Sequence, residues 1–440
     1  MIQNAGLQEV YENLFADFRS ANYRKAAERI KASPILNGWN PQEQGIANNA
    51  LYLKLHAVIA SVYDGIGDFD EASKWIEHQG SDVKCILASY LLKLKQAVDG
   101  DVATDLVLCE RDLLFARSWF VLRYAVSAYR RSDFAESLSL LDMTGNGTRS
   151  LIRLDESRAE WLPGMAIDSA LLLASVHYWR GCSLVYTKSL EEAEKCFIDA
   201  LKIVVEQHQK PPKGSLFSEE QLNHADYLCG RILLGLGLAK FRQGAFTSAK
   251  SHLLAARTLL ARAGNDSIRI KRAELLLLSV ERITVGDDGE TLYKDVILPL
   301  QQLLCDFQEH KAYRRRTLWT LAHAYISLSD CQWKPTEETV ATCLEKAAMH
   351  IYEALELCDP RTLTDLMECL LLQARILRKQ GRSREALEKT RTILAGKKLG
   401  RWDVETDWEL YPFYRTQVLI AVGQAQYKLA LTIEKDKKEK

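Results

Sequence analysis

Apolar residues recur at positions i, i+3, i+4 and i+7 through nearly the whole chain. This spacing places them on one face of an α-helix, and it is clearest at about 218–243, 267–283 and 364–380. Only 9 prolines occur in 440 residues, whereas sheet proteins of this length carry more turn residues and more alternating Val, Ile and Thr runs. The pattern therefore predicts an all-α fold.

Turn residues interrupt the helical pattern at intervals, at 65–68, 144–147, 210–214, 286–289 and 396–400. The stretch that contains Pro211 and Pro212 is followed by a capping box that begins at Ser218, with Gln221 as its third helical residue. We therefore predict an N-terminal helical array at 1–209, a linker or long loop at 210–217, a C-terminal array at 218–433 and a frayed charged tail at 434–440.

A recurring frame of small and large residues spans several predicted helix pairs. In its clearest copy, Gly237 lies within the first helix, Gly244 ends that helix, Phe246 opens the second, and Ala249 and Leu253 pack the second helix back on the first. Further copies lie at Ala60, Tyr63, Gly67, Phe69, Ala72 and Ile76, at Gly181, Leu190, Ala193, Phe197 and Ala200, and at Ala374, Leu377, Gly381 and Ala386.

This frame resembles the tetratricopeptide repeat (TPR). The resemblance implies a right-handed α-solenoid of antiparallel helix pairs, in which each pair packs on its neighbours. The family's regular period of about 34 residues is missing, so longer or additional helices must separate some units. One copy is split by an insertion at 329–338, and its Trp333 either contacts a partner or packs back on the array.

Motifs that would indicate chemistry are missing from the sequence. It contains no H-E-x-x-H, no G-x-S-x-G and no phosphate-binding G-x-x-x-x-G-K-[ST]. His224 and Cys229 lie five residues apart without the second pair that a tetrahedral zinc site needs. We therefore expect no catalytic residues, no metal and no cofactor, so the protein is not expected to be an enzyme.

Charge and composition indicate the cellular environment of the protein more clearly than the identity of its partner. The 58 basic and 58 acidic residues cancel, so bulk charge favours neither nucleic acid nor membrane, and only local patches matter. The ten cysteines include no C-x-x-C pair, which is typical of reduced thiols. The first residues lack the features of a signal peptide, and no apolar run approaches the length of a membrane span. We therefore expect a cytoplasmic protein that does not bind membranes.

The TPR resemblance also implies where a partner would bind, because the first helix of each pair lines the concave face. Carried over residue by residue, it nominates Trp119, Tyr129, Arg130, Tyr178, Tyr186, Arg231, Phe241, Arg242, Arg316, Trp319, His323, Arg375, Arg378 and Lys379. Aromatic and basic residues interleave in this set, whereas acidic residues gather elsewhere, as at 337–365. The set predicts a groove for a segment that carries carboxylates or phosphates. The alternative is that these cations are ordinary solubilising residues on exposed helix faces.

These observations predict a non-catalytic scaffold or regulatory subunit that binds a protein or peptide, possibly through an acidic segment of that partner. Tetratricopeptide co-chaperones grip a terminal carboxylate with Lys and Asn, but the matching positions here hold Tyr178 with Cys182 and Leu234 with Leu238, which disfavours chaperone tails. One alternative is RNA or single-stranded nucleic acid in the basic groove, which a neutral pI near 7.1 makes the weaker hypothesis. A ligand-sensing regulator of a signalling or defence effector, or a stimulator of a partner's phosphatase activity, are further alternatives.

Overall fold

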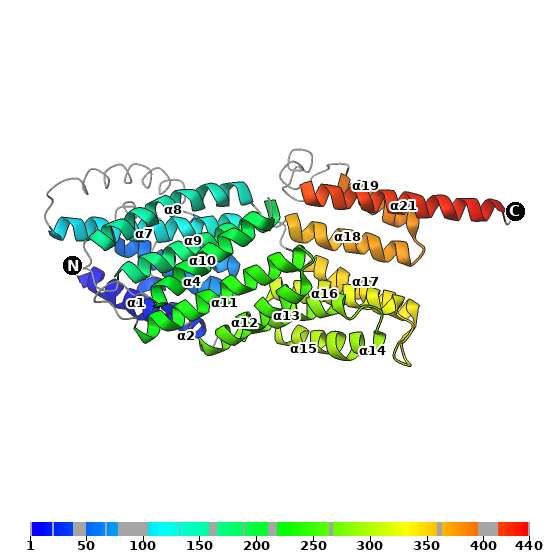
Figure 1. The fold of residues 1–440 in the computed structure, drawn as a ribbon, viewed down its shortest axis with the longest axis horizontal. Helices are drawn as coiled ribbons and strands as arrows, with labels where there is room; N and C mark the ends of the chain where they lie inside the picture. The colour runs from blue at the N-terminus through cyan, green and yellow to red at the C-terminus, as the bar shows by residue number, and fades with distance from the viewer. Residues whose placement is uncertain are drawn as a thin grey trace. The chain divides into compact units, whose positions relative to one another are not determined.

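The computed structural model describes twelve ranges of the chain, which are 2–19, 22–37, 50–66, 68–77, 104–131, 133–157, 165–187, 190–209, 218–263, 267–358, 363–394 and 412–438. Helices dominate these ranges, which contain no strand, and successive helices fold back on one another as antiparallel pairs (Figure 1). The predicted all-α class and helix-pair solenoid are confirmed.

The chain falls into two compact units, 1–273 and 274–440. One helix, α13 (Ser267–Thr284), begins in the first unit and ends in the second. The predicted linker at 210–217 lies outside the described residues, so a division there stays a prediction. The fraying of 434–440 also stays a prediction, and helix α21 extends to Lys438.

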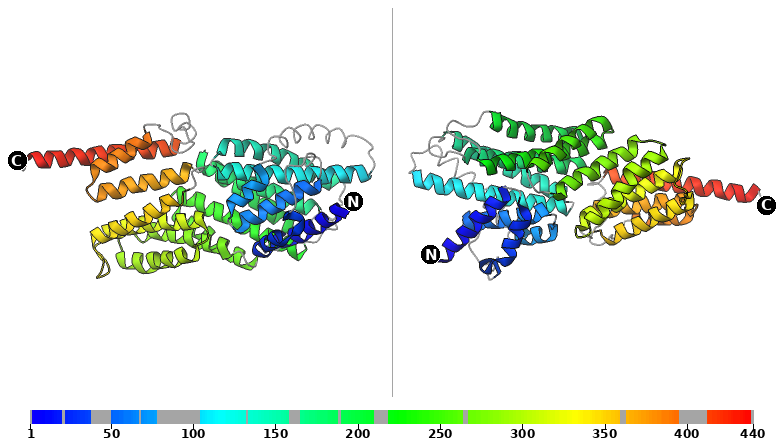
Figure 2. Two further views of the ribbon diagram at one scale, coloured as in Figure 1. Left: turned by 180° about the vertical axis from the view of Figure 1, so that it is seen from behind. Right: turned by 90° about the horizontal axis from the view of Figure 1, so that it is seen from below.

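Unit 1 contains the helices α1 (Ile2–Arg19), α2 (Tyr23–Ala32), α3 (Pro34–Asn37), α4 (Ala50–Ile66), α5 (Phe69–Glu77), α7 (Thr104–Arg130), α8 (Phe134–Ser157), α9 (Met165–Thr187), α10 (Leu190–Gln209), α11 (Glu219–Arg242) and α12 (Phe246–Arg262). Each of α4, α7, α9 and α11 pairs with the helix that follows it, and also contacts the next member of this set. These four helices therefore form an inner layer. Helix α1 packs on α2, α4 and α11, so it lies against that layer, and Figure 2 shows α1, α2 and α4 grouped together.

Glycines permit the close helix crossings in unit 1. A Cβ added to Gly181 would lie 2.7 Å from the ring of Phe197, and one added to Gly235 would lie 2.5 Å from the same ring. A Cβ at Gly237 would lie 2.6 Å from Leu253, as the repeat frame predicts. Gly244 ends its helix with a φ of 78°, a left-handed conformation that glycine adopts without strain.

The predicted turn at 144–147 is wrong, because α8 continues through it. The hydroxyl of Thr144 donates to the carbonyl of Leu140 at 2.7 Å, and that of Thr148 donates to the carbonyl of Thr144 at 2.8 Å. Both threonines are buried, so these bonds satisfy hydroxyls that would otherwise be costly to bury. Tertiary packing thus overrides the weak helix propensity of Gly145 and Gly147.

Unit 2 contains the end of α13 and the elements α14 (Gly289–Thr291), η2 (Leu292–Ile297), α15 (Leu298–Asp306), α16 (Lys311–Asp330), α17 (Val340–Glu356), α18 (Leu363–Lys379), α19 (Ser383–Leu394) and α21 (Pro412–Lys438). Helix α16 pairs with α17, α18 pairs with α19, and α21 packs on both helices of the latter pair. The insertion between α16 and α17 approaches Gly289 so closely that an added Cβ would meet the carbonyl oxygen of Trp333 at 2.2 Å. The Trp333 side chain is 40% exposed and lies 6.5 Å from the ring of Tyr293.

Candidate functional site

A cavity lies in unit 1 between α1 and the inner layer of helices. Its lining comes from α1, α2, α4, α7, α9 and α11, and it combines aromatic rings with buried charged groups. The cavity volume of about 60 Å³ is room for a few waters. In this conformation the free space therefore suits a single side chain or chain terminus.

Aromatic rings form much of the cavity wall. Phe15 and Phe18 of α1 lie 5.4 and 5.7 Å from the ring of Trp119 on α7. On the α9 and α11 side, the guanidinium of Arg231 lies 4.8 Å from the ring centre of Tyr178 and 5.0 Å from that of Trp179. Cation–π attraction of this kind strengthens when the groups are removed from water, and Arg231 is only 7% exposed.

A cluster of one carboxylate and four arginines lies beside this wall: Asp64, Arg123, Arg130, Arg231 and Arg269. Asp64 is 3% exposed. Its carboxylate accepts a hydrogen bond from Arg130 at 2.9 Å, and its oxygens lie 3.7 to 3.9 Å from the other three guanidiniums. Burial by itself would raise the pKa of Asp64, but the guanidiniums outweigh it and hold that pKa below its usual range.

The arginines of this Asp64 cluster lie close to one another as well as to the carboxylate. Burial lowers the pKa of Arg123 to about 10, with Asp64 opposing the shift and Arg231 adding to it. Among the described residues, the Nε atoms of Arg123 and Arg231 and the Nη2 atom of Arg231 are buried without a hydrogen-bond partner. Within the described ranges, Arg123 and Arg231 therefore keep buried donors without an acceptor.

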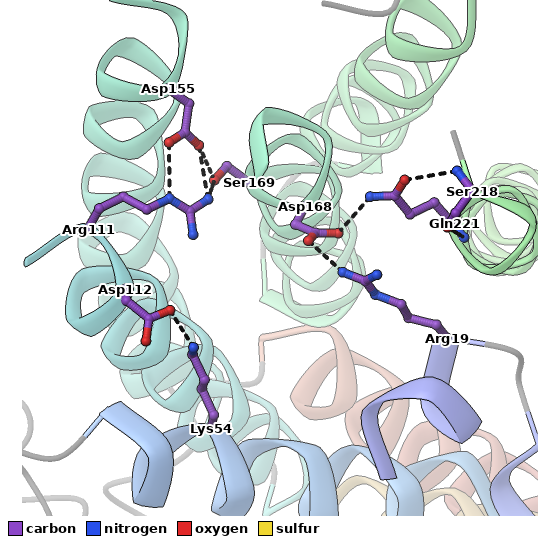
Figure 3. A network of polar contacts seen from close by, with 9 residues as sticks. All are labelled: Arg19, Lys54, Arg111, Asp112, Asp155, Asp168, Ser169, Ser218 and Gln221. Atoms are coloured by element: carbon purple, nitrogen blue, oxygen red, sulfur yellow. Dashed lines mark hydrogen bonds and ion pairs between the residues drawn. The ribbon is translucent and has the colours of Figure 1, made fainter. Parts of the chain in front are cut away.

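A network of ion pairs and hydrogen bonds connects α1 to α9 and α11, as Figure 3 shows. Arg19 at the end of α1 contacts Asp168 on α9 at 2.5 Å, and Asp168 also accepts a hydrogen bond from Gln221 at 3.3 Å. Gln221 in turn accepts a hydrogen bond from the backbone N–H of Ser218, completing the predicted capping box of α11. Burial raises the pKa of Asp168, and Arg19 opposes the shift. The contact positions the α1 wall of the cavity.

His224 of α11 also lines the cavity, and its imidazole is uncharged. Burial, reinforced by Arg19, Arg231 and Arg123, lowers its pKa to about 3. The imidazole is therefore neutral at physiological pH, and its ring lies 5.1 Å from that of Phe18. Its Nδ1 atom is another buried polar atom without a hydrogen-bond partner among the described residues.

The structure brings some of the sequence-nominated residues together and separates others. Trp119, Tyr178 and Arg231 line the cavity, and Arg130 belongs to the Asp64 cluster beside it. Tyr129 lies 5.4 Å from Trp179, which itself lines the cavity.

The remaining nominees of unit 1 lie away from the cavity lining. Tyr186 stacks on Phe134 at 5.1 Å, and the guanidinium of Arg242 lies 4.4 Å from the Tyr186 ring. Phe241 lies 6.0 Å from Phe246, at the joint of its own helix pair.

Unit 2 holds a second, smaller cluster of nominated residues. Arg316 lies 4.1 Å from the ring of Trp319, which lies 4.2 Å from that of His323. Burial lowers the pKa of His323 well below its usual value, and Arg282, Arg375 and Arg316 add to the shift. Carboxylates of the same unit already neutralise part of this charge, because Arg316 pairs with Glu368 at 2.5 Å and Lys379 pairs with Asp330. Arg378 is half-buried near the end of α18.

Several residues of the unit 1 site were not found from the sequence, and these are Phe15, Phe18, Arg19, Tyr23, Asp64, Arg123, Asp168, Trp179, His224, Tyr227 and Arg269. Two sequence spacings could have indicated some of these residues. Arg123 and Arg130 are seven apart on one face of α7, and Tyr227 and Arg231 are four apart on one face of α11. No local pattern places α1 on α11, since that contact joins residues about 200 positions apart.

The described residues contain no group of three or more His, Cys, Asp or Glu side chains that could hold a metal ion. Within the same ranges, none of the helices has the length and apolar character needed to cross a bilayer. The chemistry available in the cavity is hydrogen bonding and charge pairing by arginine, and stacking by aromatic rings.

Comparison with known proteins adds a distant likeness to solved structures. No protein-family model matches the chain, and no curated protein matches it. A crystal structure of Rap protein complexed with competence and sporulation factor aligns with a TM-score of 0.48 at 12% identity, over 96% of this chain and 99% of that one. At this level of similarity, conclusions about the site depend on the residues of this chain alone.

Proposed function

We propose that the chain is a non-catalytic, TPR-like binding protein whose cavity in unit 1 receives part of a protein or peptide partner. The observation that carries this proposal is the combination of a cavity, aromatic walls and buried hydrogen-bond donors without acceptors. Such sites bind ligands because a few placed polar groups orient what the apolar walls hold. The small free volume indicates that one side chain or terminus of the partner is inserted while the rest remains outside.

The cluster in unit 2 supports this assignment less well. Its Arg316 and Lys379 are paired with carboxylates of the same unit, and such pairing reduces the field that would attract an anionic partner. The cavity in unit 1 therefore accounts better for binding than the basic groove expected from the sequence.

Panning of the full chain against a random peptide library tests the proposal. Ser175 lines the cavity and donates to the carbonyl of Leu171 at 2.9 Å, so the ring of Ser175→Phe would occupy the cavity. Ser150 of α8 makes the same i−4 bond to Asn146 at 3.1 Å but lies outside the lining, which makes Ser150→Phe the matched control.

Peptides selected by the wild type should bind Ser150→Phe equally and lose at least tenfold in affinity for Ser175→Phe. Circular dichroism establishes that both variants are folded. Equal binding to both variants would place the site elsewhere, and the absence of any selected peptide would contradict the proposal.

A further inference from the structure

The buried guanidinium of Arg231 has one edge, formed by Nε and Nη2, without a hydrogen-bond partner among the described residues. These two N–H groups point in parallel, which matches the two oxygens of a carboxylate. Among the described residues, three other arginines use the same edge in this way. Arg111 holds Asp155 at 3.0 and 3.1 Å, Arg262 holds Asp226 at 2.8 Å for both bonds, and Arg382 holds Glu385 at 2.7 and 2.5 Å.

The surroundings of Arg231 explain why a carboxylate of this chain does not take that edge. The nearest one, Asp64, lies 3.7 Å from Nη2 and accepts its hydrogen bond from Arg130. The other carboxylate in the cavity lining, Asp168, is paired with Arg19 and Gln221. Both carboxylates therefore bond to other residues, and the Nε and Nη2 edge of Arg231 is available to an acceptor from a ligand.

Charge favours an anion in this position. The described residues of the cavity lining include three arginines, Arg19, Arg123 and Arg231, and one carboxylate, Asp168, with Asp64 beside them. His224 adds no charge, because its pKa is about 3. Positive charge left in excess in a buried site is costly, and an incoming carboxylate would offset part of that cost.

We propose that Arg231 binds a carboxylate of the partner through its Nε and Nη2 edge, while the rings of Tyr178, Trp179 and Tyr227 enclose the bound group. This inference rests on the proposed function and specifies the chemistry of the inserted group. The carboxylate belongs either to an Asp or Glu side chain or to a C-terminus, since both present the same pair of oxygens.

Proton–nitrogen NMR of the arginine Nε–H groups tests this inference on the wild-type chain. The probes are N-acetylphenylalanine and its C-terminal amide, which differ only in the carboxylate, together with inorganic phosphate. Arg231→Lys assigns the Arg231 signal. The Arg111 Nε–H is the internal control, because Asp155 already occupies it.

The acid should shift the Arg231 signal and leave that of Arg111 unchanged, and it should bind at least about tenfold more tightly than the amide. Equal binding of acid and amide, a stronger response to phosphate, or no shift of the Arg231 signal would each overturn the carboxylate assignment. Panned peptides that are sensitive to Ser175→Phe would still support the proposed function in those cases, so the two failures are distinguishable.

Where such peptides exist, amidating their C-terminus and replacing each Asp or Glu by Asn or Gln identifies the source of the carboxylate. A tenfold loss from one of these changes supports the inference and names the source. No loss from any of them overturns it.

Discussion

Replacing Asp64 by asparagine should destabilise unit 1 strongly. The side chain is 3% exposed, and it is the carboxylate that the Arg123, Arg130, Arg231 and Arg269 guanidiniums share, at 2.9 to 3.9 Å. Asparagine has nearly the same volume, so no cavity is created and the loss is electrostatic. Removing one partner of a buried ion pair costs about 3–5 kcal/mol, and Asp64→Asn should fall at the upper end because several cations lose their counter-charge.

Thermal and urea unfolding, followed by circular dichroism, measure this cost. A loss of about 3–5 kcal/mol lowers the melting temperature of a unit of this size by about 6 °C or more. The matched control is Asp226→Asn, which breaks a bidentate pair with Arg262. Because Arg262 is 66% exposed, solvent screens that pair, and the control should cost less than about 1 kcal/mol.

The pH dependence gives an independent check of the Asp64 assignment. Burial would raise the pKa of Asp64, but the four guanidiniums lower it below its usual range. A depressed carboxyl pKa contributes stability that is present above the pKa of the unfolded state, about 3.9, and is lost only as the pH falls through the folded value. The difference between wild type and Asp64→Asn should therefore be constant from pH 5 to pH 8. A cost equal to that of Asp226→Asn would refute the reasoning.

Three further predictions concern packing, titration and the second cluster. Gly237→Leu should lower the melting temperature by several degrees, because even an added Cβ would lie 2.6 Å from Leu253. The control Gly423→Ala should be tolerated, because an added Cβ there would have nothing within 4 Å. Equal melting temperatures for the two variants would disprove the repeat frame. NMR titration should find His224 neutral from pH 5 to 8, and a bound carboxylate should raise its pKa above the value of about 3, so an ionisation near pH 6.5 in the free protein would contradict its placement. Replacing Arg375, Arg378 and Lys379 of unit 2 together by glutamate should leave the protein folded and the binding of panned peptides unchanged. Loss of that binding would place the site at these three residues.

Sequence periodicity predicted the helices well because each depends on local spacing. The predicted ranges 218–243, 267–283 and 364–380 correspond to α11, α13 and α18 within about one residue at each end. The repeat frame also located close crossings such as that of Gly237 with Leu253. The turn expected at 144–147 failed because buried hydroxyl bonds and packing hold those residues in α8.

The candidate site was less accessible to sequence reasoning. The repeat frame nominated Trp119, Tyr178 and Arg231 because inner-layer helices repeat the same orientation, and the structure places all three in the cavity lining. It could not find Asp64 or Arg19, whose roles depend on contacts between residues far apart in the chain. Nor could it show which cations are neutralised, as Arg316 is by Glu368, since opposite charges in different helices pair only after folding.

Hydrogen–deuterium exchange of the full chain with a panned peptide tests most directly whether the cavity is the binding site. Protection on binding should concentrate in α1, α7, α9 and α11 around Trp119 and Arg231, and it should disappear in Ser175→Phe but not in Ser150→Phe. Protection confined to α16 and α18 of unit 2, or unchanged by Ser175→Phe, would contradict the account.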